Sequence, residues 1–406
     1  MNNNSGSDEA GSNGFFKRWT NKINANRPVP GSLKVRVGKP SIDGSGMSAS
    51  HYSPPPHAKS DKVSGASEED TSHMKITSTP GKSYRISQFE QILDADNVDL
   101  NALRKLSWNG VPAEFKNMVW QLLLGYLPTN KSRRESSIYR KRKEYTDSIP
   151  VYFDISDSER TSQEGETLRQ ILVDLPRTCP DTPFFHQHIV QKAMERILYI
   201  WAIRHPASGY VQGMNDLLTP MFLVSMYPFV DDVMRCDVAT VDSRVMMDVE
   251  ADAYWCLTKL LDNIQDHYTF SQPGLQRMVL RLEDLMHRID AELHQHMDNE
   301  GLQYMQFSFR WMNCLLLREL PLRVILRIWD TYLSEERGGF ENFHVYVCAV
   351  LLKTFREKLL KMSFQEVLMF LQELPTSEWR NDEVEPVLSQ AYILSTLFED
   401  SPSHLA

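Results

Sequence analysis

The sequence predicts an all-α fold, an irregular stack of a dozen or more helices behind a disordered N-terminal region. From Tyr84 onward apolar residues recur with a period of about 3.6, and no segment shows the alternation of a strand. Turn and capping residues divide this part of the chain into segments of ordinary helix length. No repeat of fixed period is present, which argues against a solenoid. We therefore expect one helical domain over residues 83–406.

Residues 1–82 have a different composition. They are rich in Ser, Gly, Pro and Asn and poor in aliphatic residues. Such a segment buries too little apolar surface to offset the entropy of ordering it, so we predict that it is disordered. Residues 14–23 are an exception, because their aromatic and aliphatic residues fall on one side of a short helix beside basic residues. We interpret them as a candidate peripheral membrane contact or partner-docking peptide.

Bulk composition excludes several classes of protein. The chain is 42% hydrophobic and 24% charged, which is ordinary for a soluble protein with a sizeable core. It has no apolar run of about 18 residues and no apolar signal core at its start, so we expect a cytoplasmic location. The net charge of −9 argues against nucleic acid as a partner. The five cysteines form no Cys-x-x-Cys pair, which favours neither a disulfide framework nor a zinc site.

Capping residues and prolines set the expected helix boundaries. Asp99 is a candidate N-cap, Pro112 fits the first turn of the next helix, and Gly125 fits its stop. Thr182-Pro183 is expected to begin a long helix that ends near Arg204. Further helices are expected at 211–226, 245–267, 274–297, 303–319, 321–335, 342–360, 363–373 and 384–399, with an acidic loop over 227–244.

Arg177 directly follows Pro176, just after a helix expected over residues 161–173 with Leu168, Ile171 and Leu172 inward. Asp174 falls at the C-terminal end of this helix, where the helix dipole disfavours a carboxylate. We therefore expect Asp174 to pair with a nearby cation or hydrogen-bond donor and to brace the loop that presents Arg177. The proline fixes one backbone torsion beside the arginine and so lowers the entropy of holding it outward.

Gln212 precedes Gly213 and follows a turn over residues 205–210. We expect it in the first turn of the next helix, where free backbone N–H groups suit a phosphate or an ordered water. A rigidly held arginine and glutamine match the needs of phosphoryl transfer to water, because the arginine neutralises charge and the glutamine orients the water. Each residue alone also fits an ordinary surface role. The chain has no phosphate-binding loop, so the nucleotide would come on a partner.

Several motifs together resemble the TBC domain, which is found in GTPase-activating proteins for Rab GTPases. The two central motifs are Ile171-x-x-Asp174-x-x-Arg177 and Tyr210-x-Gln212-Gly213-Met214. The opening motif Gly110-Val111-Pro112 with residues 120–125, and the later motifs at 310–321 and Ile328-Trp329-Asp330, occur in the same order. Within the family, residues 203–213 most resemble the subfamily called TBC domain family member 22.

The resemblance implies an all-helical fold and a two-finger mechanism. Arg177 would be the arginine finger that reaches toward the β- and γ-phosphates of GTP, and Gln212 would orient the hydrolytic water in place of the GTPase's own glutamine. The supporting residues would be Asp174, Tyr210, Gly213 and Asn215. The chain would have no substrate site and no cofactor of its own, because GTP and Mg²⁺ arrive on the Rab. It would act as a catalytic activator in vesicle trafficking, peripheral at Golgi membranes.

A non-catalytic adaptor of the same shape, binding a GTPase or a Golgi-associated partner, is the alternative. The presence of both Arg177 and Gln212 argues against it, because a scaffold needs neither. Lys116 departs from the family, which usually has arginine there, and this puts a structural brace near the start of the domain in question.

Two other patterns are weaker. The pairs His186/His188 and His294/His296 have i, i+2 spacing, which points their side chains to opposite sides of a helix, so no metal site is expected. The basic clusters at 131–134 and 140–143 fit a solvated helix face, or else a contact for an anionic membrane or an acidic partner.

Overall fold

The computed structural model describes residues 80–398, with side chains from Tyr84 onward. Every regular element in this range is helical, and an isolated bridge between Asn97 and Asn130 is its one strand-like pairing. The predicted all-α fold is confirmed. The predicted disorder of residues 1–82 and the apolar pattern at 14–23 lie outside the described residues, except that the first helix already begins at Pro80.

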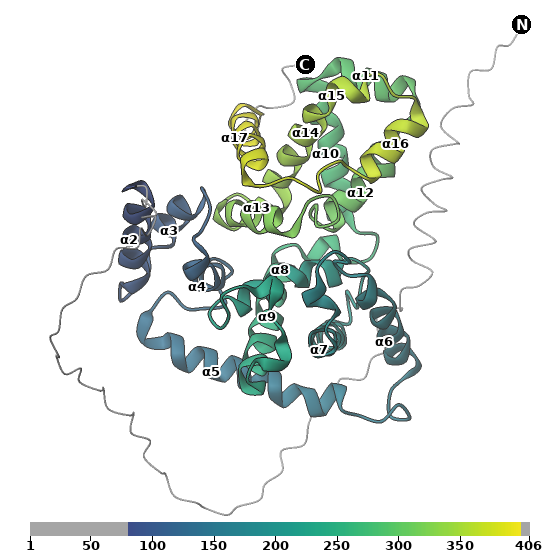
Figure 1. The fold of residues 1–406 in the computed structure, drawn as a ribbon. Coiled ribbons are helices and arrows are strands. Elements are labelled where there is room, and N and C mark those ends of the chain that lie inside the picture. Colours follow the sequence, from purple (N-terminus) through teal and green to yellow (C-terminus); the bar gives the residue numbers. More distant parts are fainter. Residues whose placement is uncertain (1–79, 399–406) are drawn as a thin grey trace, which may run out of the picture.

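The α-helices of this range form two groups in Figure 1. In chain order they are α2 (Pro80–Asp94), α3 (Leu100–Ser107), α4 (Ala113–Leu123), α5 (Lys131–Ser148), α6 (Ser162–Asp174), α7 (His188–Arg204), α8 (Met214–Met226), α9 (Ser243–Asn263), α10 (Pro273–Ile289), α11 (Ala291–Asn299), α12 (Met305–Asn313), α13 (Leu322–Ser334), α14 (His344–Thr354), α15 (Arg356–Leu359), α16 (Phe364–Gln372) and α17 (Asn381–Phe398). Helices α5 to α9 make one group and α10 to α17 the other, and α8 contacts α13 where the groups meet (Figure 1). Helices α2 to α4 lie to one side in Figure 1, with a small hydrophobic cluster of their own, and α3 and α4 contact α13.

Local capping explains several helix starts. The Asp99 carboxylate accepts hydrogen bonds from the backbone N–H groups of Asn101 and Ala102, at 2.9 and 3.2 Å, and so begins α3 as predicted. Helix α6 begins with a capping box, in which Thr161 and Glu164 each bind the other's backbone N–H. Both devices involve residues within one turn of each other, which is why they can be recognised in the sequence.

Four predicted helices are interrupted. The segment 245–267 breaks at Ile264, between α9 and a 3₁₀ turn (Gln265–His267). The segment 182–204 is a 3₁₀ turn (Pro183–His186) followed by α7, because Gln187 is extended and its side chain binds the backbone of Cys236 and Val238. The segment 274–297 breaks at Asp290, whose carboxylate caps α11 and pairs with Arg356. The segment 342–360 breaks between α14 and α15. At Gln187 and at Asp290, a tertiary hydrogen bond outweighs the propensity of the segment to form a continuous helix.

Lys116 braces the start of the domain against α13. Its Nζ lies 2.5 Å from the Asp330 carboxylate and donates to the Leu326 carbonyl at 3.3 Å. Asp330 is buried and also accepts from the Val111 backbone N–H at 2.8 Å and from the Trp120 indole at 2.7 Å. Burial lowers the pKa of Lys116, and the attraction of Asp330 opposes this shift. Lys116 therefore forms the structural brace near the start of the domain, although the family usually has arginine at this position.

Residues 80–398 contain neither a membrane-spanning helix nor a cluster of metal-binding side chains. No helix in this part of the chain is long and apolar enough to cross a membrane. No group of three or more His, Cys, Asp or Glu side chains in it could hold a metal ion. In the histidine pair of α11, His296 instead contacts the Met362 carbonyl at 2.9 Å.

Candidate functional site

Arg177 lies at the end of a short 3₁₀ turn (Leu175–Arg177) that continues directly from α6. Ile171 and Leu175 are buried and fasten the end of the helix and the turn to the core. The arginine side chain, in contrast, is 54% exposed. The inward position predicted for Leu172 is wrong, because the buried face of α6 runs through Ile171 and Asp174, and Leu172 is 44% exposed beside it.

Asp174 connects the Arg177 turn to a second turn of the chain. One carboxylate oxygen accepts from Arg177 Nε at 3.0 Å and also pairs with Nη2. The other accepts from the Tyr210 hydroxyl at 2.7 Å. Asp174 thus pairs with the cation that its place in the sequence predicted. Burial and the neighbouring Asp174 raise the pKa of Tyr210 well above its usual value, so this hydroxyl stays a hydrogen-bond donor.

Asn215 closes the network between the two turns. Its buried Oδ1 accepts from the Gly213 backbone N–H at 3.1 Å and lies 3.2 Å from the Tyr210 hydroxyl. Its Nδ2 donates to Thr178 Oγ1 at 2.9 Å, and Thr178 donates to the Asp174 carbonyl at 3.0 Å. The two sequence motifs are therefore joined by one buried set of hydrogen bonds. Thr178 belongs to this set, although no sequence pattern pointed to it.

Gln212 lies outside the helix in which it was predicted. Helix α8 begins at Met214, and Gly213 precedes it with φ +106°, so Gln212 occupies the turn before the helix. Its side chain is exposed and makes no hydrogen bond to another described residue. Its carbonyl accepts from Asn313 Nδ2 at 3.0 Å. The exposed carboxamide is therefore free to engage a partner, while its backbone is held.

Gly213 is needed for two reasons. Its positive φ is rarely adopted by residues with a side chain. In addition, a Cβ at this position would lie 2.5 Å from Asn313 Nδ2 and 3.2 Å from Cys314 Sγ. The glycine therefore allows the end of α12 to approach the Gln212 turn closely. Helix α12 ends at Asn313, six residues before the predicted end at 319.

A buried ion pair supports the first turn of α8. Asp216 is buried and accepts from Arg318 Nε at 2.8 Å, and Cys314 Sγ lies 3.6 Å away. Burial raises the pKa of the Asp216 carboxyl, and the Arg318 guanidinium opposes the shift. Asn313, Cys314 and Arg318 all fall inside the motif at 310–321, but the sequence assigned them no role. Their spacing in the sequence does not indicate that they contact the start of α8.

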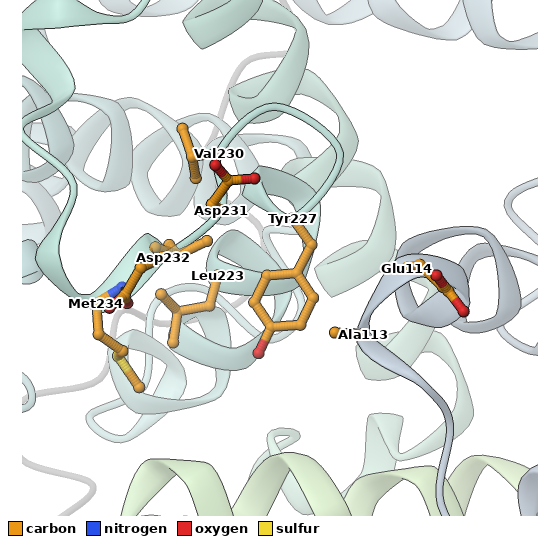
Figure 2. Close-up of a pocket in the computed structure, with 9 residues that line it drawn as sticks. Ala113, Glu114, Leu223, Tyr227, Val230, Asp231, Asp232 and Met234 are labelled. Carbon is orange, nitrogen blue, oxygen red and sulfur yellow. The ribbon is translucent and has the colours of Figure 1, made fainter. Parts of the chain in front are cut away.

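A separate cavity of about 310 Å³ lies at the other end of α8 (Figure 2). Its lining comes from Leu223 and Tyr227, from the acidic loop that follows, and from the start of α4. Glu114, Asp231 and Asp232 make this lining anionic, which disfavours a nucleotide. Burial raises the pKa of Tyr227 to about 12. Neither Arg177 nor Gln212 contributes to the cavity.

Comparison with known proteins decides the family. Residues 113–360 match the model of the Rab-GTPase-TBC domain. This chain belongs to the Rab-GTPase-TBC family. The resemblance inferred from the motifs is thereby confirmed, and the two turns described above are the places where the TBC signature motifs meet in space.

This TBC-family chain has close relatives. It is 50% identical over 322 residues to human TBC1 domain family member 22B. It is 48% identical over 323 residues to the GTPase-activating protein gyp1 of Schizosaccharomyces pombe. Each alignment covers 79% of this chain and 63% of the relative, so the chain spans less than two thirds of their length.

A solved structure shares the fold of this TBC-family chain. The crystal structure of the Ypt/Rab-GAP domain of Gyp1p superposes with a TM-score of 0.74 and 46% sequence identity. The superposition covers 78% of this chain and 99% of that structure. The helical architecture is therefore that of a Rab-GAP domain.

Proposed function

We propose that this chain is a GTPase-activating protein for a Rab-family GTPase, to which it supplies Arg177 and Gln212 in trans. The observation that carries the proposal is the buried network of Asp174, Tyr210 and Asn215, which joins the turns bearing these two exposed side chains. Family membership and the names of the relatives support the same function. GTP and Mg²⁺ would be carried by the Rab.

In this proposal Arg177 stabilises the negative charge that develops on the transferring phosphoryl group. An arginine supplied in trans accelerates hydrolysis by about 10³–10⁵, equivalent to roughly 4–7 kcal/mol of barrier. The guanidinium is held at Nε and Nη2 by Asp174, and Tyr210 holds the opposite carboxylate oxygen, so the turn enters the complex already ordered. Preorganised charge avoids reorganisation at the moment of reaction.

Gln212 would orient the attacking water. Its exposed side chain has no competing hydrogen bond to a described residue, and its backbone is fixed by Asn313. The apolar side chains of Leu172 and Val173, exposed on α6 just before Asp174, would contact the GTPase surface beside the fingers. The proposed interface thus combines two polar catalytic groups with an apolar rim.

Single-turnover GTP hydrolysis across a panel of Rab proteins tests the proposal. We expect Arg177→Ala and Gln212→Ala to abolish most of the stimulation, by about 10³-fold for the arginine, while the proteins stay folded. Arg235→Ala and Gln365→Ala are matched controls, because both side chains are exposed and neither belongs to the two finger turns. A folded Arg177→Ala protein with full activity on its cognate Rab would refute the mechanism. Binding to a Rab without any stimulation by the unmodified protein would favour the adaptor.

We also propose that the protein acts in vesicle trafficking at Golgi membranes, with residues 14–23 as a peripheral membrane contact. This part of the proposal rests on the family resemblance and on the amphipathic sequence pattern. Vesicle co-sedimentation of the full chain and of a chain lacking residues 1–30 tests the contact. Equal binding of the two would contradict it.

A further inference from the structure

The chain reverses direction immediately after Asn313 through a strained turn. Leu315 has φ +49° and Leu316 has φ +61°, and both side chains are fully buried. A residue with a side chain rarely adopts this left-handed conformation, because its Cβ lies too close to the following carbonyl oxygen. Such a turn persists only where the surrounding packing imposes it. It fixes Asn313 and Cys314 in place against Gly213.

In the described part of the chain, the non-glycine residues with positive φ lie at three places. They are Cys179, Ser271, Gln272, Leu315 and Leu316. Cys179 comes two residues after Arg177. Ser271 and Gln272 follow Tyr268, whose hydroxyl donates to the Asn313 carbonyl at 2.8 Å. Two of these places directly follow Arg177 and Asn313, and the third is connected to Asn313 through Tyr268.

Asn313 and Asn215 hold opposite ends of one peptide group. The carbonyl of Gln212 accepts from Asn313 Nδ2 at 3.0 Å. The N–H of the same peptide, which belongs to Gly213, donates to Asn215 Oδ1 at 3.1 Å. A planar peptide bound at both its C=O and its N–H cannot rotate about the adjoining bonds. The direction in which the Gln212 side chain leaves the backbone is therefore set by these two asparagines together.

The Oδ1 atom of Asn313 indicates that the hydrogen bond from Nδ2 to Gln212 sets the orientation of the carboxamide. Asn313 is only 7% exposed, and its Oδ1 is buried without a hydrogen-bond partner in the described residues. A buried acceptor without a partner destabilises the fold, because it has lost its hydrogen bonds to water. Turning the amide around would place its oxygen against the Gln212 carbonyl. The Asn313 carboxamide is therefore oriented by its hydrogen bond to the Gln212 carbonyl, although this orientation leaves Oδ1 without a partner.

We infer that Asn313 is a positioning residue for Gln212, through which α12 and the strained turn behind it aim the glutamine at the water. This inference rests on the proposed function. Asn313 is buried and would not touch the GTPase, so its loss should lower kcat and leave KM for the GTP-bound Rab nearly unchanged. A displacement of about 1 Å at a reacting group can lower a rate by about 10²-fold, so we expect a 10- to 100-fold loss of kcat for Asn313→Ala.

A double-mutant cycle tests the inference. Asn313→Ala is measured in the unmodified chain and in the Gln212→Ala chain, by single-turnover hydrolysis on the cognate Rab. If Asn313 acts through Gln212, its loss has no further effect once Gln212 is absent. Ser308→Ala is the matched control, because it removes a buried hydrogen bond of α12 that does not reach Gln212, and it should keep full activity. An equal loss in both backgrounds, or no loss in the unmodified chain, would overturn the inference.

A second readout does not depend on activity. Hydrogen exchange of the Gly213 amide should accelerate in Asn313→Ala and stay unchanged in Ser308→Ala, because only the former frees the Gln212–Gly213 peptide. Unchanged exchange in Asn313→Ala overturns the inference, whatever the hydrolysis assay gives. Should Gln212→Ala retain full stimulation, the proposed role of the glutamine fails, and the exchange measurement still decides whether Asn313 holds the peptide.

A milder variant covers the case in which Asn313→Ala does not fold. Tyr268→Phe removes only the hydroxyl that donates to the Asn313 carbonyl. We expect a smaller loss of kcat, an unchanged KM and a modest acceleration of Gly213 exchange. Unchanged kcat and exchange in a folded Tyr268→Phe chain would count against the inference.

Discussion

Gly213→Ala is the substitution for which the structure gives the sharpest expectation. The φ of +106° places alanine in a sparsely populated region, at a cost of about 1–3 kcal/mol. The new Cβ would lie 2.5 Å from Asn313 Nδ2, so the asparagine must move and lose its bond to the Gln212 carbonyl, which adds about 0.5–1.5 kcal/mol. We expect the free energy of unfolding to fall by about 1.5–4.5 kcal/mol in total.

Gly125→Ala separates the two contributions. Gly125 has φ +74°, and a Cβ there would meet no atom within 4 Å, so only the backbone cost of about 1–2 kcal/mol remains. Urea unfolding of both variants measures the difference. Single-turnover hydrolysis should show a loss of about 10²-fold for Gly213→Ala, through displacement of Gln212, and full activity for Gly125→Ala. Equal destabilisation by the two variants, with full activity in both, would refute the reasoning.

Three further predictions concern the interface, the brace and the effect of pH. Val173→Ser should raise KM for the GTP-bound Rab about 3- to 10-fold by removing apolar contact and leave kcat unchanged, whereas Ile393→Ser, equally exposed on α17, should change neither. Asp330→Ala strands the buried Lys116 ammonium and should lower the free energy of unfolding by about 3–5 kcal/mol. By contrast, Asp94→Ala breaks an exposed ion pair and should leave the urea midpoint nearly unchanged. Burial lowers the pKa of His344 to about 3, so the unfolded chain binds a proton that the folded protein does not as the pH falls below 6.5. The free energy of unfolding should then fall by about 1.4 kcal/mol per pH unit between about pH 6 and 4, and His344→Gln should lack this contribution in that range; an unchanged slope would contradict it.

The helical class, some helix starts and some short-range contacts of this protein could be predicted from its sequence, because they depend on residues close together in the chain. Apolar periodicity predicted the all-α fold, and Asp99 predicted a helix start, because a cap and the N–H groups that it binds lie within one turn. The pairing of Asp174 with Arg177 followed from a carboxylate at the wrong end of a helix dipole, three residues from a cation. Gly213 was part of a recognised motif, but its positive φ and the close approach of Asn313 to it were found only in the structure.

Only the tertiary structure decided how these pieces meet. Asn313 lies 101 residues from Gln212 and Lys116 lies 214 residues from Asp330, and no local pattern brings either pair together. The exposure of Leu172 and the break at Gln187 were likewise decided by what packs against each segment. Helix periods and caps depend on neighbours within a turn, so the sequence by itself determined the helical class. Its motifs also singled out Arg177 and Gln212 as the candidate fingers. The aim of Gln212 depends on hydrogen bonds between distant helices, and these exist only once the two groups of helices have packed together.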